Sequence, residues 1–225
     1  LLRRASDLPD GFVCLAEQQS SGRGRRGRPW RSPFGRNLYL SVAWSYGGGA
    51  AALEGLSLAV GVALRDALAE LGVGDVELKW PNDVLRRGAK LAGILVELAG
   101  SASGSCTAVV GVGVNLRMPV EDAAAIDQRW ADLADLDVGR NRLAGVFLNR
   151  LLPLLADYER TGFAPWRDRW TACHAWTGKT VRVERPAGAF AGTALGVDER
   201  GALRVQTASG IETVYGGEVS LRVAS

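Results

Sequence analysis

Histidine and cysteine are scarce in this chain, and their scarcity excludes several kinds of site. His174 is the only histidine among 225 residues, so no Ser–His–Asp triad can be assembled, and we expect a chance placement on the surface or in the core and no catalytic pair with Cys173. The cysteines Cys14, Cys106 and Cys173 are odd in number and far apart, which provides neither a disulfide framework nor metal-ligand spacing. Such cysteines suit a reducing compartment, so we expect a cytoplasmic protein without a protein-bound metal.

Long apolar runs are also missing. No stretch reaches the roughly 20 apolar residues that a membrane-spanning helix needs, and no signal peptide is visible, so we expect no membrane association. Apolar residues still make up 47% of the chain, which is enough for a core. The length of 225 residues suits one large domain, or a large domain followed by a small one.

Positive charge is concentrated in one segment, residues 22–31, which holds five arginines and three glycines but no acidic residue. Each glycine costs a helix about 1 kcal/mol relative to alanine, and glycines inside a strand have no side chain to pack. The segment therefore predicts a mobile loop whose guanidinium groups can form paired hydrogen bonds with phosphate or carboxylate. It lacks the Lys-Ser/Thr ending of a nucleotide-hydrolysing P-loop, which disfavours that class.

Two interpretations of this basic loop remain, a nucleic-acid-binding patch and a site for a small anion. The formal net charge of the chain is +3, and the loop contributes +5, so the remainder carries −2. A nucleic-acid-binding protein usually spreads its basic residues along a face or a helix. The charge distribution therefore favours a small anionic ligand.

Hydrophobic periodicity and turn residues predict an α+β fold. Apolar residues at three- and four-residue steps predict a helix over residues 52–71, ended by Gly72, and another over residues 141–158 that Pro153 should kink or weaken. A shorter helical piece is expected at residues 163–170. Strand-forming runs are expected at residues 12–18, 37–44, 76–80, 90–98 and 107–114.

Composition changes after Trp176. Short β-like runs separated by turn residues follow, and five runs at this spacing predict a small barrel. We therefore divide the chain into residues 1–176 and residues 177–225. The five runs are residues 180–184, 190–197, 202–207, 211–214 and 219–223.

Lysines and glycines stand at two places beside the predicted strands. Lys79 and Lys90 lie in or next to buried-looking strands, and because isolated buried charge is costly, each either reaches water at a strand end or has a purpose. Gly111 and Gly113 interrupt the apolar strand before Asn115. Glycines inside a strand indicate either a bulge or the close approach of a ligand.

Together these motifs resemble the biotin–protein ligase family. The matching segments follow the family's order: Glu17-Gln-Gln-x-x-Gly22-Arg-Gly-Arg-Arg-Gly-Arg-x-Trp30, Lys79-Trp-Pro-Asn-Asp83, Lys90-Leu-Ala-Gly93-Ile-Leu-Val-Glu97, Gly111-x-Gly-x-Asn115 and Gly216-Gly-Glu-Val-Ser-Leu-Arg222. They span nearly the whole chain. The resemblance implies a mixed sheet packed with helices, the class II synthetase-like catalytic domain of biotin and lipoate ligases, followed by a small SH3-like β-barrel.

The resemblance implies an ATP-dependent, AMP-forming enzyme that attaches biotin to a lysine of a biotin carboxyl carrier protein. The biotin carboxylate attacks the α-phosphorus of ATP, which gives biotinyl-5′-adenylate and pyrophosphate, and the acceptor lysine then displaces AMP. The reacting anions need cationic screening and the adenylate needs shielding from water, so we expect the basic loop to be a lid that orders over its ligands. Mg²⁺ is expected with ATP, held largely by phosphates and water.

The same resemblance assigns roles to positions of this sequence. Lys90, placed to bridge the biotin carboxylate and the α-phosphate, and Arg25 are implied as catalytic residues. Asp83 matches the family motif, and the resemblance leaves open whether it supports the loop or positions phosphates through a metal. The implied biotin-binding residues are Gln19, Arg23, Gly24, Arg25, Tyr39, Lys90, Gly93, Gly111 and Gly113. The implied ATP- or adenylate-binding residues are Arg25, Arg26, Arg28, Trp30, Asn115 and Arg222.

The resemblance also leaves alternatives open. Lipoate–protein ligase shares the fold, although the basic loop and the Lys-Trp-Pro-Asn-Asp motif favour biotin. The family carries a Ser-Thr-Asn motif upstream of the position that matches Leu1, so we expect weak biotin binding if the polypeptide begins there. A homodimer is expected from the family. A DNA-binding repressor role would require a helix-turn-helix domain upstream of Leu1.

Overall fold

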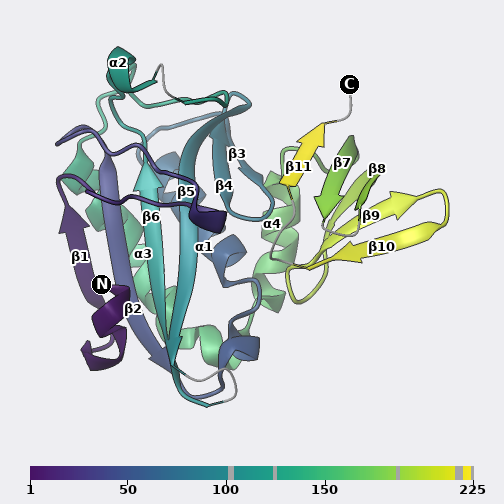
Figure 1. Ribbon diagram of the computed structural model, residues 1–225, viewed down its shortest axis with the longest axis horizontal. Helices are drawn as coiled ribbons and strands as arrows, with labels where there is room; N and C mark the ends of the chain where they lie inside the picture. The colour runs from purple at the N-terminus through teal and green to yellow at the C-terminus, as the bar shows by residue number, and fades with distance from the viewer. Residues whose placement is uncertain (101–103, 124–125, 186–187, 216–219, 224–225) are drawn as a thin grey trace.

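A six-stranded sheet forms the larger part of the molecule in the computed structural model (Figure 1). The structure describes residues 1–100, 104–123, 126–185, 188–215 and 220–223. The strands of the sheet lie in the order β1-β2-β6-β5-β4-β3. They are β1 (Phe12–Ala16), β2 (Leu38–Tyr46), β3 (Val76–Lys79), β4 (Asp83–Arg86), β5 (Ala89–Gly100) and β6 (Cys106–Val114).

The α+β class is confirmed, but the strand directions are not mixed as we expected. Each neighbouring pair in this sheet is antiparallel. The physical reason is the length of the connections, because the short turns that join β3 to β4 and β4 to β5 can link only antiparallel neighbours. The long connection from β2 to β3 passes through helix α1 (Leu56–Glu70) and joins strands that are not adjacent.

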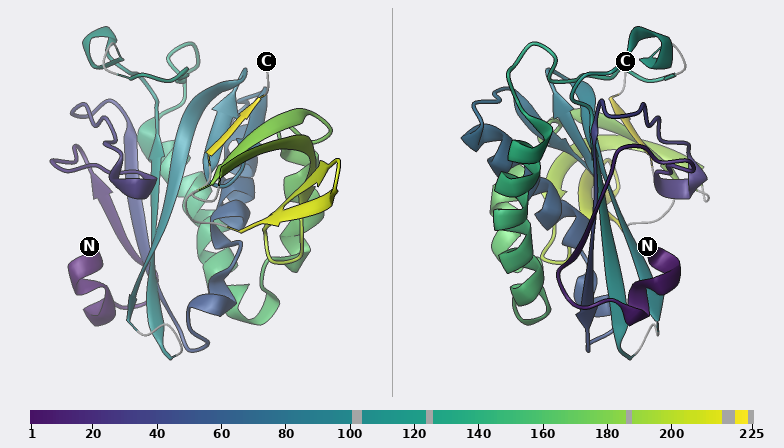
Figure 2. Two further views of the ribbon diagram at one scale, coloured as in Figure 1. Left: turned by 45° about the vertical axis from the view of Figure 1, so that its right-hand side comes forward. Right: turned by 90° about the vertical axis from the view of Figure 1, so that its left-hand side faces the viewer.

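Helices cover one face of the sheet. Helix α1 and helix α3 (Arg140–Thr161) lie on this face, whereas the 3₁₀ helix η1 (Leu2–Asp7) and the basic loop lie on the other, as the edge-on view shows (Figure 2). Gly61 of α1 faces the sheet, because a Cβ there would make ordinary contacts with Leu78 at 3.5 Å and with Ile94 at 3.6 Å. Those two side chains therefore point toward the helices, and the adjacent positions of β3 and β5 point toward the loop.

The predicted helices are confirmed with small changes in their bounds. Helix α1 ends just before Gly72, as expected. Helix α3 runs through Pro153 to Thr161, beyond its predicted end. The helical piece predicted at 163–170 consists of η4 (Ala164–Trp166) and α4 (Arg167–Cys173), and the remaining short helices are η2 (Arg25–Gly27), η3 (Ala50–Leu53) and α2 (Val120–Ala123). In the part of the chain that the structure describes, no helix has the length and apolar character to cross a membrane.

A second, smaller sheet follows near the C-terminus. All five predicted strands are present, in the antiparallel order β10-β9-β8-β7-β11, which confirms the small β domain. Closure into a barrel stays a prediction, because no pairing joins β10 to β11 among the described residues. The strands are β7 (Thr180–Arg185), β8 (Gly188–Val197), β9 (Leu203–Thr207), β10 (Gly210–Val214) and β11 (Ser220–Val223).

The junction between the two sheets contains the one histidine of the chain. His174 is 7% exposed, stacks on Trp170 at 4.6 Å between ring centroids, and places Nδ1 3.1 Å from Oγ1 of Thr177. Burial, helped by the positive charge of Lys179, lowers the pKa of His174 from 6.5 to about 4. Of the two placements that we expected, surface or core, the structure shows the core, with the imidazole neutral at physiological pH.

This buried histidine should make the junction sensitive to acid. The folded-state pKa of about 4 lies below the ordinary value of 6.5, so the unfolded chain binds a proton first on acidification. We expect the free energy of unfolding to fall between pH 6.5 and pH 4, by up to about 3 kcal/mol from this group. Urea unfolding of the wild type and of His174→Phe across this range measures the effect. Equal pH slopes for the two proteins would contradict it.

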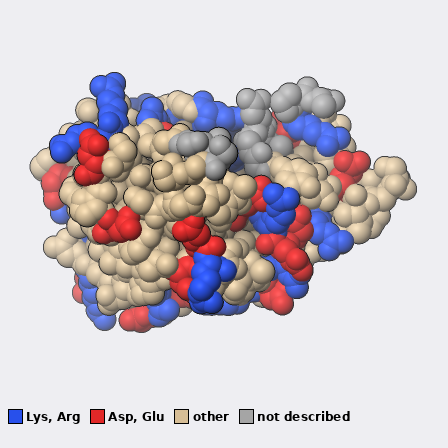
Figure 3. All heavy atoms as spheres, turned by 90° about the horizontal axis from the view of Figure 1, so that it is seen from below, with Lys and Arg blue, Asp and Glu red and all other residues tan. Residues whose placement is uncertain are grey.

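Acidic and basic side chains lie close together on one face of the molecule. On the described part of the face seen from below, acidic and basic groups are interspersed, and no continuous basic stripe crosses it (Figure 3). This arrangement agrees with the slightly negative balance of the chain outside residues 22–31. It gives no support on this face to an extended nucleic-acid-binding surface.

Candidate ligand-binding site

One row of residues crosses the sheet on the face opposite the helices. Residues paired across antiparallel strands point to the same side, so the side chains of this row share that face. Glycines occupy its centre and leave a hollow, and charged residues stand beside them on β4 and β3. From β1 to β3 the row consists of Ala16, Tyr39, Gly113, Gly93, Asp83 and Lys79.

The indole of Trp30 lies on this glycine hollow. A Cβ at Gly113 would lie 2.7 Å from Cε2 of Trp30, and a Cβ at Gly93 would lie 3.2 Å from its Cζ3. A side chain at Gly113 would therefore overlap the indole, which explains the glycine by close approach and not by a bulge. The buried Nε1 of Trp30 has no hydrogen-bond partner among the described residues.

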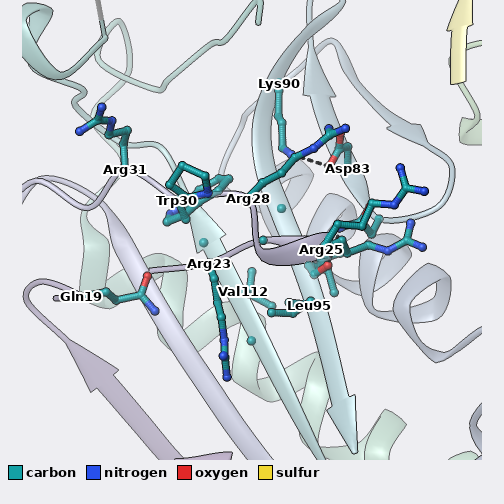
Figure 4. Close-up of a pocket in the computed structure, with 18 of the residues that line it drawn as sticks. Gln19, Arg23, Arg25, Arg28, Trp30, Arg31, Asp83, Lys90, Leu95 and Val112 are labelled. Carbon is teal, nitrogen blue, oxygen red and sulfur yellow. Dashed lines mark hydrogen bonds and ion pairs between the residues drawn. The ribbon is translucent and has the colours of Figure 1, made fainter. Parts of the chain in front are cut away.

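The basic loop folds back on itself as an arch over the hollow. Trp30 N donates to Gly22 O at 2.8 Å, and Gly24 N donates to Arg28 O at 2.7 Å. The turn between them uses the left-handed region, with φ of 61° at Arg26 and 70° at Gly27. The expected loop is thus confirmed, although it contains the single 3₁₀ turn η2. Among its arginines, Arg28 extends toward Lys90 and Asp83, whereas Arg31 points away from them (Figure 4).

A carboxylate between two ammonium groups lies beside the hollow. Lys90 Nζ is 2.7 Å from Asp83 Oδ1, and Lys79 Nζ is 3.8 Å from Asp83 Oδ2 (Figure 4 shows the shorter pair). The side chains of Lys90 and Asp83 are only 18% and 13% exposed. Burial lowers the pKa of Arg25, and the negative charge of Asp83 opposes that shift. Cations thus outnumber carboxylates here, which favours the binding of an anion.

Asn115 presents an unsatisfied acceptor. Its Nδ2 donates to Ala131 O at 3.1 Å and to Lys90 O at 3.5 Å, so the amide orientation is fixed by two carbonyl groups. Its Oδ1 is buried and has no hydrogen-bond partner among the described residues. A buried acceptor without a partner is costly, and a ligand with an N–H group would satisfy it.

These elements enclose a cleft of about 960 Å³, which contacts most of the predicted site residues. The prediction that Tyr39 belongs to the site is corrected, because this residue does not line the cleft. It is 3% exposed, and its hydroxyl donates to Pro33 O at 3.0 Å, which anchors the chain after the arch. The side chain of Arg222 lies outside the described residues. The predicted residues that line the cleft are Gln19, Arg23, Gly24, Arg25, Arg26, Arg28, Trp30, Asp83, Lys90, Gly93, Gly111, Gly113 and Asn115.

One wall of the cleft was missed by sequence reasoning. Ile126, Asp127, Gln128 and Trp130 line it. Backbone hydrogen bonds tie this segment to β5, from Lys90 N to Arg129 O at 3.0 Å and from Ala131 N to Lys90 O at 2.8 Å. The sequence there shows no regular periodicity, and Ile126 and Trp130 were the residues that could have indicated an apolar wall.

The arch is expected to open and close. Its hydrogen bonds are few and its arginines are many, so trypsin should cut the empty protein within residues 22–31 faster than elsewhere. Ligands that bridge the arch and the sheet should slow this cleavage by about tenfold or more. Limited proteolysis with biotin and MgATP, followed by mass spectrometry of the fragments, measures the change. Equal cleavage rates with and without ligands, or resistance of the empty arch, would contradict a lid.

Fold and cleft together define a class: a domain with a hollow floored by glycines, next to a cluster of cations under a basic loop. The comparisons agree. Residues 2–115 match the model of the biotin/lipoate A/B protein ligase family, and residues 177–222 match the biotin protein ligase C-terminal domain. The chain belongs to the biotin/lipoate A/B protein ligase family.

Relatives cover the chain from end to end. The bifunctional ligase/repressor BirA of Escherichia coli K12 is 40% identical over 100% of this chain and 70% of its own length. The biotin--[acetyl-CoA-carboxylase] ligase of Paracoccus denitrificans is 35% identical over 97% of this chain and 93% of its own. Among solved structures, the Aquifex aeolicus biotin protein ligase in complex with biotin and ATP superposes with a TM-score of 0.83 at 28% identity, covering 99% of this chain and 94% of that one.

Proposed function

We propose that this chain is a biotin–protein ligase that joins biotin to a lysine of an acceptor protein at the expense of ATP. The observation that carries the proposal is the glycine hollow next to the Lys90–Asp83 pair, covered by the arginine arch. A flat ring system fits the hollow, and its carboxylate can reach Lys90. The relatives support it, since they include ligases named for biotin and a structure that holds biotin with ATP.

In the first half-reaction a biotin carboxylate oxygen attacks the α-phosphorus of ATP, and the bond to pyrophosphate breaks. The two reactants are both anions, so their approach requires positive charge between them. Lys90 is placed to contact both, with Arg25, Arg26 and Arg28 above it on the arch. Mg²⁺ enters with ATP as part of the substrate. The proposed contacts of biotin are Gln19, Arg23, Gly24, Arg25, Lys90, Gly93, Gly111 and Gly113.

Trp30 and Asn115 are proposed to select the rest of the ligand. The indole covers the hollow in this structure, so the biotin ring enters only when the indole shifts or becomes a stacking partner. The free Oδ1 of Asn115 accepts a hydrogen bond, which suits the exocyclic amino group of adenine and disfavours a carbonyl in its place.

In the second half-reaction the acceptor lysine attacks the acyl carbon of the adenylate, and AMP leaves. The acceptor that we propose is a biotin carboxyl carrier protein. Its lysine must enter while the arch keeps water from the mixed anhydride. A domain boundary near residue 177, a homodimer, cytoplasmic location and a repressor role remain predictions, as does the contact of Arg222 with the nucleotide.

Biotin-dependent exchange of pyrophosphate into ATP tests the proposal without knowledge of the acceptor. We expect exchange with biotin and much slower exchange with lipoate, because relatives that match nearly the whole of this chain are named for biotin. Exchange with lipoate alone would favour the lipoate-ligase alternative. Binding of nucleic acid that falls steeply with salt, without any exchange, would favour the nucleic-acid alternative.

A further inference from the structure

Five side chains form a line from the domain junction to the arch. Lys79 Nζ lies 5.1 Å from the ring centroid of Trp176 and 3.8 Å from Asp83. Asp83 lies 2.7 Å from Lys90, whose Nζ is 5.6 Å from the ring centroid of Trp30. Aromatic rings thus flank a cation–anion–cation cluster at both ends. One ring belongs to the segment that enters the small β domain, and the other belongs to the arch.

The turn that carries this cluster is held from both sides. Trp80, between Lys79 and Asp83, donates from Nε1 to Gly201 O of the small domain at 3.0 Å. Asn82 donates from Nδ2 to Ile94 O on β5 at 2.8 Å. Because both neighbours are anchored, Lys79 and Asp83 have little freedom to move apart.

Asp83 carries a negative charge in a site that attracts anions. While the cleft is empty, its carboxylate satisfies Lys90, and the shorter of its two ion pairs is with that residue. An arriving carboxylate or α-phosphate competes for the same ammonium group. Asp83 would then repel the newcomer across a weakly solvated site, unless a second cation stays with it. Lys79 is such a cation, as is Arg25, whose charge Asp83 also attracts, and the ring of Trp176 holds the ammonium group of Lys79 in place.

We propose that Lys79 is a positioning residue for adenylate formation. Trp176 holds it beside Asp83, and Lys79 keeps Asp83 paired so that Lys90 can exchange that carboxylate for the incoming anion. The proposal rests on the proposed function. It also gives the Lys-Trp-Pro-Asn-Asp segment a single purpose. Trp80 and Asn82 fix the turn, so that Lys79 at one end stays paired with Asp83 at the other.

A double-mutant cycle tests this role. Lys79→Gln should lower kcat for biotin-dependent pyrophosphate exchange by about 10–30-fold, whereas Lys79→Arg, which keeps the charge and can stack on Trp176, should retain most of the rate. In an Asp83→Asn background the same Lys79→Gln change should cost less than about threefold, because no carboxylate remains to be neutralised. Trp176→Leu should lower the rate by a smaller factor in the same direction. Arg150→Gln, which breaks a surface ion pair with Glu70 on the helical face, is the matched control and should leave the rate unchanged.

The outcomes separate the two proposals. If the wild-type chain shows no biotin-dependent exchange, the proposed function fails and the role of Lys79 fails with it. If the wild type is active, a normal rate for Lys79→Gln overturns the positioning role alone. A loss that persists in full in the Asp83→Asn background also overturns it, because Lys79 would then contact a substrate directly. Thermal unfolding of each variant detects loss of fold, and if Lys79→Gln does not fold, Trp176→Leu in both backgrounds replaces it in the cycle.

Discussion

Replacing Lys90 by glutamine should lower the rate of biotin-dependent pyrophosphate exchange by about 10³-fold. Lys90 is the cation that lies in the floor of the cleft, 18% exposed and in contact with Asp83 at 2.7 Å. Glutamine keeps much of the length but supplies no charge between the carboxylate and the α-phosphate. Because Asp83 would also remain as an anion beside the reacting groups, their approach should become more difficult still. Single-turnover formation of the adenylate measures this step directly.

The control for this prediction is Lys90→Arg, which retains the charge in a different shape and should recover part of the rate. Melting temperatures should show that the glutamine variant is folded, since Asp83 keeps Lys79 as a partner at 3.8 Å. A folded Lys90→Gln protein within tenfold of the wild-type rate would exclude Lys90 from the catalytic role and leave the arch arginines to supply the screening.

Gly113→Ala should weaken biotin binding by about 100-fold. Its new methyl carbon would lie 2.7 Å from Cε2 of Trp30 and 2.8 Å from Nε1, so the indole cannot keep its position. A ligand ring placed on the same floor would meet the same methyl group. Gly113 lies in the regular strand β6, where alanine adopts the backbone without strain, so the fold should survive. Isothermal titration with biotin measures the loss.

Gly145→Ala is the matched control for Gly113→Ala. Gly145 lies in helix α3, where a Cβ would meet nothing within 4 Å beyond its own stretch of helix. Alanine there should leave biotin affinity unchanged and raise the free energy of unfolding by about 0.5–1 kcal/mol. Unchanged biotin affinity of Gly113→Ala would show that the ring binds elsewhere in the cleft, and the hollow would then serve only to seat Trp30.

Most of the fold was predictable because its signals are local. The periodicity of α1 and the change of composition after Trp176 depend on neighbouring residues alone. Strand β4 was missed because Asp83–Arg86 is short, follows a turn and has a charged residue at each end. Arg86 is nevertheless 5% exposed, since it forms a bidentate pair with Asp135 from a distant segment. A burial that depends on so distant a partner leaves no local pattern.

The candidate site was predictable as a set of residue types, and less so as a geometry. The arginine arch, Lys90 and the glycines of β6 were identified from composition and motifs. Their alignment was not, because the row of Gly93, Gly113 and Asp83 is fixed by the register between strands, including a shift between Val84 and Leu85, and the pattern within one strand does not reveal that register. Tyr39 has a place in that row and was assigned to the pocket, but its hydroxyl is directed to Pro33 instead.

The hydrogen bond from Trp80 to Gly201 also determines how the molecule comes apart. Trp80 is 1% exposed, and its indole crosses from the large sheet to the turn between β8 and β9. On the same side Arg200 pairs with Glu54, and Gly201 approaches Gly55 so closely that a Cβ at Gly201 would lie 2.8 Å from Gly55 Cα. We therefore expect the two segments separated by composition to unfold as one cooperative unit. We expect a chain cut near residue 177 to unfold and not to be a smaller working enzyme.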